Sequence, residues 1–226
     1  MATRSRRGRP RGDALSRERI VAAAIEMLDE EGEGALTFRQ LTARLGTGSG
    51  AIYWHVADKE ELLAAAADVV VARAVAGAAA DLEPRESIRA VALGVFDAFN
   101  AHPWLGAQLA RVPWQPAVLH LFEGVGLPLQ ALGVPYAAQF NAATALVSYF
   151  VALAAQHAAA TRLQLRETDR PTFLAAIAAQ WSAQYDSSTH PFVHHLAEQL
   201  AEHDDREQFI AGLELILAGI DTLREE

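Results

Sequence analysis

Apolar residues recur every three or four positions along most of the chain, which is the spacing of one face of an α-helix. Alanine is abundant and runs of β-branched residues are few, and both features favour helix over strand. The first periodic stretch follows Ser16, a residue suited to cap a helix, and stops at Gly32. Its apolar stripe consists of Ile20, Val21, Ala24, Ile25 and Leu28. The pattern predicts an all-α protein that starts with a scaffold helix.

Residues 36–59 carry the most informative pattern of polar and apolar positions in the chain. Thr37, followed three residues later by Gln40, forms a capping box, which starts a helix over Phe38–Leu45. Gly46 ends this helix because glycine adopts the left-handed backbone conformation that other residues avoid. A first short helix with a sharp end is therefore expected here.

A second short helix is expected directly after the first. Ser49 is placed to cap a helix over Gly50–His55. Two short helices joined by a glycine-containing turn form a helix-turn-helix unit, whose second helix enters the major groove of DNA. The apolar residues spaced to face inward are Leu41, Leu45, Ile52 and Val56. The pattern predicts an N-terminal three-helix DNA-binding head with a helix-turn-helix.

The run Tyr53-Trp54-His55-Val56, followed by Asp58-Lys59, resembles the DNA-binding head of TetR-type transcriptional regulators. The resemblance extends over residues 16–63 and returns near the C-terminus at residues 209–216. It implies a shared DNA-binding head and a variable helical body that binds an effector and dimerises. The expected domains are a flexible basic arm over residues 1–15, a DNA-binding domain over 16–60, and an effector-binding and dimerisation domain over 61–226.

The positions left for DNA lie on the outward faces of the two short helices and at the start of the next helix. Tyr53 and His55 can donate hydrogen bonds to phosphates, and Ala51 is small enough for a base edge or a thymine methyl to approach. Trp54 has two interpretations, a DNA contact or an aromatic wedge between helices. With the matching positions of the family, the expected DNA-binding set is Arg39, Thr47, Ser49, Ala51, Tyr53, Trp54, His55 and Lys59.

The first twelve residues contain five arginines and no acidic residue. As a flexible arm they can reach phosphates or a narrow minor groove, and the arginines expected to do so are Arg6, Arg7 and Arg9. The alternative is a disordered tail that only keeps the protein in solution. The chain has a net charge of −9, which divides into +1 over residues 1–60 and −10 over residues 61–226. Only the basic end is therefore suited to approach a duplex.

The body is expected to contain a cavity for a small molecule. Asp58 with Glu61 forms a capping pattern ahead of a long alanine-rich helix, to about Ala79, that leads into the body. Prolines then interrupt the pattern between His102 and Tyr136. Short helices broken by prolines leave room for an apolar cavity with few polar anchors, which is typical of ligand sites. The expected lining is Phe96, Phe99, His102, Trp104, Trp114, Phe122, Asn141, Tyr149 and His157, with core packing as the alternative role of each.

The last helix, expected over Asp205–Leu223, carries an apolar arc that is too wide for one neighbour within the chain. Together with the long apolar helix expected over Ala137–Leu165, it is predicted to form a four-helix interface across a two-fold axis. The expected dimer contacts are Phe209, Leu213, Ile216, Leu217 and Ile220.

Other chemistry has little support in the sequence. The absence of cysteine excludes disulfides and thiolate metal sites. The late histidines His190, His194, His195 and His203 lack the spacing of a metal or catalytic motif, and solvent exposure is the preferred interpretation over a metal site. The apolar run over residues 142–160 is interrupted by polar residues, so a buried helix is expected rather than a membrane span. We expect no metal, cofactor or enzymatic activity, and a cytoplasmic location.

These patterns predict a ligand-responsive regulator, a repressor that binds a near-palindromic operator as a homodimer and is released by a small apolar or aromatic molecule. One alternative is a constitutive DNA-binding regulator whose body only dimerises. The other is an enzyme of the helical-bundle kind in which the N-terminal unit is purely structural.

Overall fold

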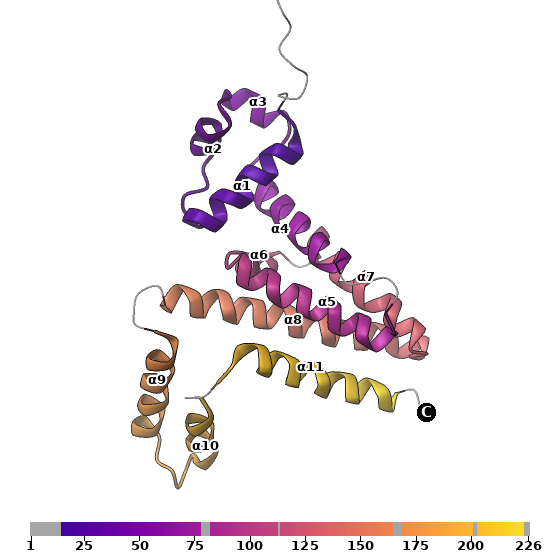
Figure 1. Ribbon diagram of the computed structural model, residues 1–226, viewed down its shortest axis with the longest axis vertical. Coiled ribbons are helices and arrows are strands. Elements are labelled where there is room, and N and C mark those ends of the chain that lie inside the picture. Colours follow the sequence, from indigo (N-terminus) through magenta and orange to yellow (C-terminus); the bar gives the residue numbers. More distant parts are fainter. Residues whose placement is uncertain (1–14, 78–81, 113, 165–168, 201–202, 224–226) are drawn as a thin grey trace, which may run out of the picture. The chain divides into compact units, whose positions relative to one another are not determined.

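The computed structural model describes residues 15–77, 82–112, 114–164, 169–200 and 203–223, except for the side chains of residues 154 and 157–164. The described residues form eleven α-helices and no strand, which confirms the all-α prediction (Figure 1). The chain divides into two compact units, residues 1–66 and 67–226. Both this division and the boundary expected after residue 60 fall within one helix, Lys59–Ala76.

The helices follow the order that the periodicity predicts. Unit 1 contains α1 (Arg17–Glu31), α2 (Phe38–Leu45), α3 (Ser49–Tyr53) and the start of α4 (Lys59–Ala76). Unit 2 contains the rest of α4, then α5 (Pro84–Ala101), α6 (Leu105–Arg111), α7 (Pro116–Ala131), α8 (Tyr136–Gln164), α9 (Arg170–Gln184), α10 (Pro191–Leu200) and α11 (Asp205–Thr222).

Helix α2 has the ends that its sequence predicts. The Thr37 hydroxyl oxygen accepts a hydrogen bond from the backbone N–H of Gln40 at 3.2 Å, and the hydroxyl donates to Gln40 Oε1 at 2.8 Å. At the other end Gly46 has φ +62° and ψ +36°, the left-handed conformation that stops the helix. The predicted helix Phe38–Leu45 is therefore confirmed residue for residue.

Helix α3 differs from its prediction at both ends. Ser49 is its first residue rather than its cap, the N-cap is Gly48, and no side chain caps the helix. At the other end, the backbone N–H groups of His55 and Val56 both bond to the carbonyl of Ile52, and the helix stops at Tyr53. The prediction that Ser49 caps a helix over Gly50–His55 was therefore wrong, because the turn after Gly46 is shorter than expected.

The apolar residues predicted to face inward form the core of unit 1. Leu41 and Ile52 are fully buried and Val56 is 1% exposed, while Leu45 is only half-buried. Each fully buried aliphatic side chain contributes about 1.5–3 kcal/mol. The stripe of α1 is buried as well, at Ile20, Val21, Ala24, Ile25 and Leu28. This core fixes which faces of α2 and α3 remain in solvent.

The segment expected to be broken by prolines is more regular than predicted. After the short α6, a 16-residue helix α7 runs from Pro116 through Pro128 to Ala131. Pro116 lies in the first turn, where proline is favoured because its missing N–H has no partner to lose. A proline in a sequence can therefore mark the start of a helix as well as its end, which is why the broken pattern was overestimated.

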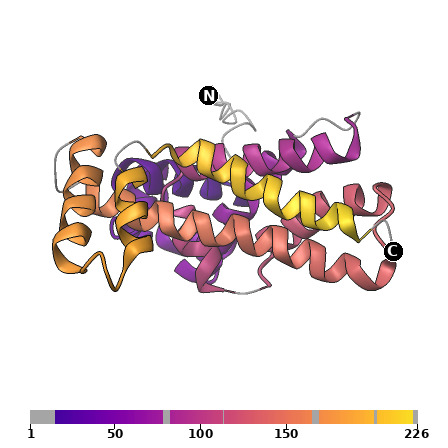
Figure 2. The same ribbon diagram turned by 90° about the horizontal axis from the view of Figure 1, so that it is seen from below.

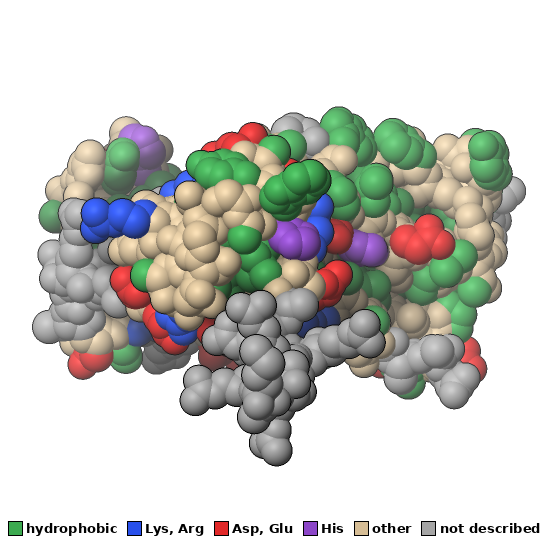
Figure 3. Space-filling model, turned by 90° about the horizontal axis from the view of Figure 1, so that it is seen from above, with side chains coloured by type: hydrophobic (Ala, Val, Ile, Leu, Met, Phe, Trp, Pro, Cys, Tyr) green, Lys and Arg blue, Asp and Glu red, His purple; other side chains and the backbone are tan. Residues whose placement is uncertain are grey.

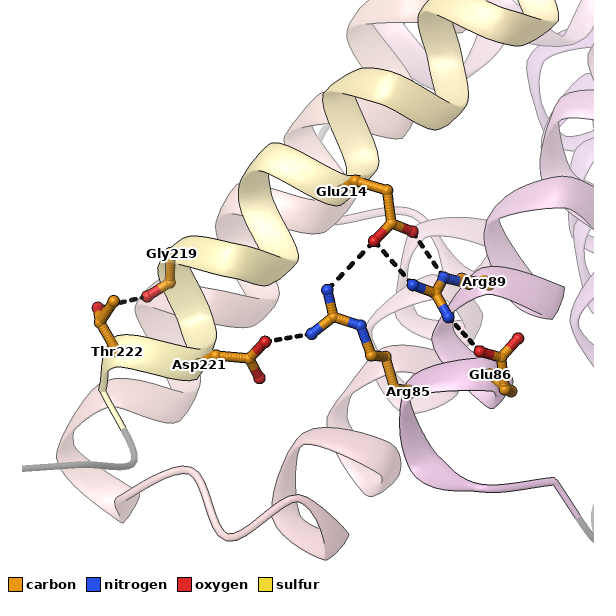
Figure 4. A network of polar contacts seen from close by, with 7 residues as sticks. All are labelled: Arg85, Glu86, Arg89, Glu214, Gly219, Asp221 and Thr222. Atoms are coloured by element: carbon orange, nitrogen blue, oxygen red, sulfur yellow. Dashed lines mark hydrogen bonds and ion pairs between the residues drawn. The ribbon is translucent and has the colours of Figure 1, made fainter.

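Helix α8 runs along unit 2 beside α5 and α11, and α9 pairs with α10 near the C-terminal end of α8 (Figures 1 and 2). Ion pairs tie α11 to α5 (Figure 4). Arg89 contacts both carboxylate oxygens of Glu214, at 2.6 and 2.7 Å, and Arg85 bonds to Glu214 at 3.1 Å and to Asp221. No described helix is both long and apolar enough to span a membrane.

Candidate DNA-binding face and effector cavities

An exposed aromatic pair marks the outward face of the helix-turn-helix unit. Tyr53 is the last residue of α3 and is 57% exposed, and Trp54 follows it and is 89% exposed. A side chain as exposed as Trp54 cannot be a wedge between helices of this chain. The wedge interpretation of Trp54 is therefore wrong for this chain, and the DNA contact stays a prediction.

Tyr53 is held in place by the helix before it. Its ring lies 4.9 Å from the ring of Phe38, centroid to centroid, with a tilt of 56° between the planes. Phe38 is the first residue of α2 and is half-buried. The contact leaves the phenol end of Tyr53 free to bond outside the chain, so its direction is set before any ligand binds.

The other expected DNA-binding residues of unit 1 lie on or near the same two helices. Arg39 and Ser49 are exposed, and Thr47, Ala51 and His55 are half-buried. Small or uncharged residues therefore dominate α3, and Arg39 supplies the guanidinium suited to a guanine or a phosphate. Arg6, Arg7 and Arg9 of the expected arm lie outside the described residues.

Lys59 has a structural role that the sequence did not reveal. Its Nζ donates a hydrogen bond to the backbone carbonyl of Glu33 at 2.8 Å, which ties the start of α4 to the segment between α1 and α2. An ammonium group carries three donors, so this bond leaves two for a phosphate. Lys59 can therefore both support the head and contact DNA.

Two further sets of contacts orient the head: the ion pairs of Arg44, which were not predicted, and the capping of α4 by Asp58 and Glu61, which was. Arg44 of α2 bonds to Glu30 at 2.7 and 2.9 Å and to Glu26 at 3.1 Å, so it fixes α2 against α1. Glu61 accepts a hydrogen bond from the backbone N–H of Ala57, while Asp58 accepts one from the backbone N–H of Glu61, both at 2.8 Å. The second pair is a reciprocal capping arrangement that starts α4.

The charge on the described surface is mixed. On the face in Figure 3, basic and acidic side chains lie interspersed among hydrophobic and uncharged ones. Attraction of DNA phosphates by the described residues of this face is therefore local, at single arginines and lysines, rather than spread over a broad basic patch.

Two cavities in unit 2 contain residues from the expected effector site. The larger, which we call the aromatic cavity, is a depression open to solvent with a volume of about 500 Å³, and it lies between α6, α7 and α8. Such a volume is in the range of small-molecule sites. The rings of Trp114 and Phe122 are stacked there with centroids 6.0 Å apart. Its lining is Leu109, Ala110, Trp114, Val118, Phe122, Thr144, Val147, Ser148, Val151 and Ala152.

The second cavity has a volume of about 200 Å³ and includes Phe96 and Phe99 among its lining residues. The side chains of Arg170, His203 and Asp205 in its lining are paired. Asp205 accepts hydrogen bonds from Arg170 at 2.6 Å and from the His203 ring at 3.0 Å. The nine residues expected to line one effector site are therefore not brought together, since Trp114 and Phe122 line one cavity and Phe96 and Phe99 another.

The remaining expected effector residues line neither of these cavities. Tyr149 packs against α11, where its hydroxyl donates to the carbonyl of Phe209 at 3.0 Å and burial raises the pKa of its phenol. Trp104 is buried with its ring 5.9 Å from that of His102, and Asn141 is exposed on α8. The side chain of His157 lies outside the described residues. For Trp104 and Tyr149, core packing is what the structure shows.

Three polar residues beside the aromatic cavity were missed by the sequence reasoning. Gln108 and Gln115 are 1% and 4% exposed, and Thr144 lines the cavity with its hydroxyl oxygen buried. Polar residues on an otherwise apolar helix face are the signal that could have identified them. Thr144 is a lining residue of the candidate site, whereas Gln108 and Gln115 lie on the same segments without lining it.

The residues expected at the dimer interface lie mostly inside the chain. Phe209, Leu213, Leu217 and Ile220 are buried within unit 2, and Ile216 is half-buried. The wide apolar arc of α11 faces two helices of its own chain, α8 and α5. The sequence prediction had assumed only one neighbour within the chain. The large apolar residues left exposed on α11 are Ile210 and Leu215, at 38% and 77%.

The late histidines contact nearby groups in their own segments. The His194 ring donates to the carbonyl of Tyr185 at 2.6 Å, and the His190 ring lies 2.9 Å from the Thr189 hydroxyl. Among the described residues, no group of three histidine, aspartate or glutamate side chains is arranged to hold a metal ion.

Comparison with known families gives a match in each unit. Residues 20–66 match the family described as bacterial regulatory proteins, tetR family. Residues 81–224 match the family described as tetracyclin repressor-like, C-terminal domain. The second match alone spans more than half of the chain.

Individual proteins resemble the chain over most of its length. The transcriptional regulator SCO7222, a TetR from Streptomyces coelicolor, is 48% identical, with a TM-score of 0.81 over 93% of this chain and 100% of that chain. The repressor DrrR1 of Streptomyces coeruleorubidus is 29% identical over 220 residues, which are 92% of this chain and 78% of DrrR1. ActR of Streptomyces coelicolor, solved in complex with actinorhodin, is 25% identical, with a TM-score of 0.73 over 91% and 95% of the two chains.

Proposed function

The chain belongs to the TetR family of transcriptional regulators, and from this premise we propose that it is a ligand-responsive repressor that acts as a homodimer. The observation that carries the proposal is the exposed pair Tyr53 and Trp54 at the end of a helix-turn-helix unit. Both side chains are available to a partner, since they are exposed beside the helix that such a unit inserts into the major groove. Helix-turn-helix units bind DNA, so DNA is the expected partner of this surface.

On DNA, α3 lies in the major groove and α2 lies across the backbone. Tyr53, braced by Phe38, donates to a phosphate, and Trp54 covers sugar and phosphate groups at the edge of the groove. Arg39 reads a guanine or binds a phosphate, and Lys59 binds a phosphate with its remaining donors. Arg6, Arg7 and Arg9 extend the contact into the minor groove.

Two copies of the head bind one operator. A two-fold dimer places its heads on half-sites about one helical turn apart, about 34–36 Å, and the operator is correspondingly near-palindromic. The dimer forms through the outer faces of α8 and α11, where small exposed residues allow close approach. On α11 they are Ala211, Ala218 and Gly219 around Leu215, and on α8 one such residue is Ala145, which does not line the aromatic cavity.

The effector is a small, largely apolar or aromatic molecule that binds in the body. The cavities of unit 2 support this part of the proposal, because a body that only dimerises needs no cavity. DrrR1 is described as a repressor, and ActR has been solved with actinorhodin bound. By similarity, these two proteins support repression and the binding of a small molecule in the body. Members of this family are generally not enzymes, and we place the protein in the cytoplasm with its DNA target.

The effector releases DNA by binding unequally to two conformers of the dimer. A ligand that prefers the conformer with the wrong head spacing lowers the operator affinity by the ratio of its affinities for the two conformers. A typical coupling of about 1–3 kcal/mol corresponds to a 5- to 150-fold change.

The test is a fluorescence-anisotropy titration of a labelled operator duplex at fixed salt, with and without small aromatic compounds that quench the protein's tryptophan fluorescence. We expect at least one such compound to weaken operator binding fivefold or more. If compounds that saturate the body leave operator affinity unchanged, the constitutive alternative replaces the ligand-responsive one. Failure of the protein to bind any duplex specifically would remove both.

A further inference from the structure

Buried polar groups without hydrogen-bond partners occur on the three segments that form the aromatic cavity, and one of them, the Thr144 hydroxyl, belongs to a lining residue. Neither the amide oxygen nor the amide nitrogen of Gln108 has a partner among the described residues, and the same is true of the Thr144 hydroxyl and of Gln115 Oε1. Buried polar groups are normally paired, and leaving one unpaired destabilises the folded protein. Three such residues in one region call for a functional explanation.

The three residues come from the three segments that form the cavity. Thr144 of α8 lines it directly, and Gln108 of α6 precedes the lining residues Leu109 and Ala110. Gln115, the N-cap of α7, donates its amide hydrogens to the carbonyls of Gln108 at 3.0 Å and Val112 at 3.1 Å. This bonding holds the Gln115 amide at the end of α6 and leaves its oxygen as a spare acceptor.

Trp114, which forms part of the aromatic wall of the cavity, has an unfavourable backbone conformation. Trp114 has φ +64°, and among the described residues it is the one non-glycine residue with a positive φ. A bulky side chain is rarely found in this conformation, which persists where the surrounding structure imposes it, often at binding sites. The conformation sets the indole beside Phe122, with an angle of 17° between the ring planes, and leaves it 65% exposed.

The smaller cavity does not offer the same chemistry. Its charged groups, Arg170, His203 and Asp205, already bond to one another. A ligand there would have to break existing pairs, whereas a ligand in the aromatic cavity would satisfy groups that have none. Of these two cavities, the aromatic cavity is therefore the one whose lining includes a buried hydroxyl, that of Thr144, with no partner among the described residues.

We propose that the aromatic cavity binds a planar aromatic molecule that carries both a hydrogen-bond donor and a hydrogen-bond acceptor. The ring system packs against Trp114 and Phe122, and its polar groups bond to the Thr144 hydroxyl and, after rotation of the side chain toward the cavity, to the Gln108 amide. A purely apolar molecule of the same size leaves these groups unpaired and is discriminated against. This inference rests on the proposed function and narrows its effector from apolar or aromatic to polar aromatic.

The first part of the experiment measures the ligand-free protein. Gln108→Leu and Thr144→Val replace unpaired polar groups with apolar groups of similar shape, so each variant is expected to raise Tm by about 2–4 °C. Gln139→Leu is the matched control, because the Gln139 amide is paired, donating to the carbonyl of Val134 at 2.9 Å. It is expected to leave Tm unchanged or to lower it. A fall in Tm for both Gln108→Leu and Thr144→Val would show that these groups serve packing and would overturn the inference.

The second part measures binding of two flat, two-ring probes by quenching of tryptophan fluorescence. 7-Hydroxycoumarin carries a hydroxyl donor and a carbonyl acceptor, and naphthalene carries neither. For each protein, the Kd for 7-hydroxycoumarin is divided by the Kd for naphthalene. Comparing this ratio between each variant and the unmodified protein cancels effects that are common to both probes. We expect Gln108→Leu and Thr144→Val each to shift this ratio about tenfold in favour of naphthalene, and Gln139→Leu to leave it unchanged.

The outcomes separate this inference from the proposed function. If both probes bind and the ratio is unchanged in Gln108→Leu and Thr144→Val, the polar-aromatic assignment is wrong while the effector cavity stands. If neither probe quenches the fluorescence of a protein that still binds operator, the aromatic cavity is not the effector site, and the inference falls with it.

Discussion

Trp54 is the residue at which the structure changes the argument most. A large aromatic residue in a helix-turn-helix unit is compatible with core packing or with DNA contact, and exposure separates the two roles. At 89% exposed, Trp54 contributes almost no burial to the fold, and its position directly after α3 leaves its ring available for a contact outside the chain.

Replacing Trp54 tests this assignment. We expect Trp54→Ala to weaken operator binding about tenfold or more, because a large contact area with DNA is lost, and to leave Tm within about 2 °C of the unmodified protein. The matched control is Tyr136→Ala, which removes a 90% exposed aromatic ring from the body. Operator affinity is measured by anisotropy and Tm by calorimetry. Equal operator affinity for Trp54→Ala and Tyr136→Ala would contradict the placement of the DNA-binding face.

Glu214 is the residue at which charge contributes most clearly to stability. The hydrogen bonds from Arg89 lower the pKa of Glu214 from an ordinary 4.5 to about 2, with a smaller effect from Arg85 and against the opposing effect of burial. A carboxyl group whose pKa is lowered by folding stabilises the protein above its unfolded pKa, and this stabilisation is lost as the pH falls toward the folded pKa. The relevant window therefore runs from about pH 4.5 down to about pH 2.

We expect Glu214→Gln to lower the free energy of unfolding by about 1 kcal/mol at neutral pH, a modest value because the side chain is partly exposed. The difference from the unmodified protein should shrink below pH 4.5 and disappear near pH 2. Urea unfolding at several pH values measures this, with Glu207→Gln on the same helix as the control. A difference that persists undiminished at the lowest pH would mean that packing, not charge, is responsible.

At the scale of single residues, local signals could be predicted and side-chain pairings could not. Thr37, Gly46 and Asp58 act on backbone groups within four positions of themselves, so their roles follow from spacing alone. The bond from Lys59 to the carbonyl of Glu33 joins positions 26 residues apart, and no spacing rule contains it. The same holds for the buried Gln108 beside the aromatic cavity.

Among the helices, α4 and α5 make the closest backbone approach that a glycine permits. A Cβ at Gly94 of α5 would lie 2.7 Å from the carbonyl oxygen of Ala74 in α4, closer than real Cβ atoms come to backbone. Because α4 begins in unit 1 and ends in unit 2, its contact with α5 is where a change in the body can move it. The glycine therefore has a role in positioning α4.

We expect Gly94→Ala to lower the free energy of unfolding by about 1–3 kcal/mol, because the added methyl group pushes two helix backbones apart. The control is Gly126→Ala in α7, where a Cβ meets nothing within 4 Å. That substitution should stabilise the protein by about 0.5–1 kcal/mol, since alanine is the better helix former. Chemical denaturation measures both. A Gly94→Ala variant as stable as Gly126→Ala would refute the close approach.

Helix ends were predicted well where a cap is present and poorly where none is. Helix α2 has a side-chain cap and a left-handed glycine, and its predicted ends are correct. Helix α3 has no side-chain cap, and Ser49, the residue that resembles one, lies inside it. The hydrogen bonds of the preceding turn decide that boundary, and they depend on the conformation of Gly46 rather than on the identity of Ser49.

For the whole molecule, the sequence pattern identifies the apolar face of a helix but not the helix against which that face packs. The arc of α11 was assigned to a second copy of the chain, yet Phe209, Leu213 and Leu217 are buried within one copy. An apolar residue carries the same signal whether its neighbour belongs to its own chain or to another. Leu215 is 77% exposed, and only the folded structure distinguishes it from the buried residues of the same helix.

The revised dimer contact leads to a direct prediction. We expect Leu215→Glu to convert the dimer into monomers in sedimentation-velocity experiments, because two like charges would face each other near the two-fold axis. The control is Leu119→Glu, which places the same charge at a 55% exposed position of α7. Persistence of a dimer in Leu215→Glu would place the interface elsewhere.

The central claim is that two heads of one dimer read a symmetric DNA site, and selection of bound duplexes from a random-sequence pool tests it most directly. At near-physiological salt concentration, we expect a near-palindrome whose half-sites are centred about 10–10.5 base pairs apart. Enrichment of no motif, with binding that disappears as salt is raised, would mean that only basic residues hold the protein on DNA. That result would contradict the account.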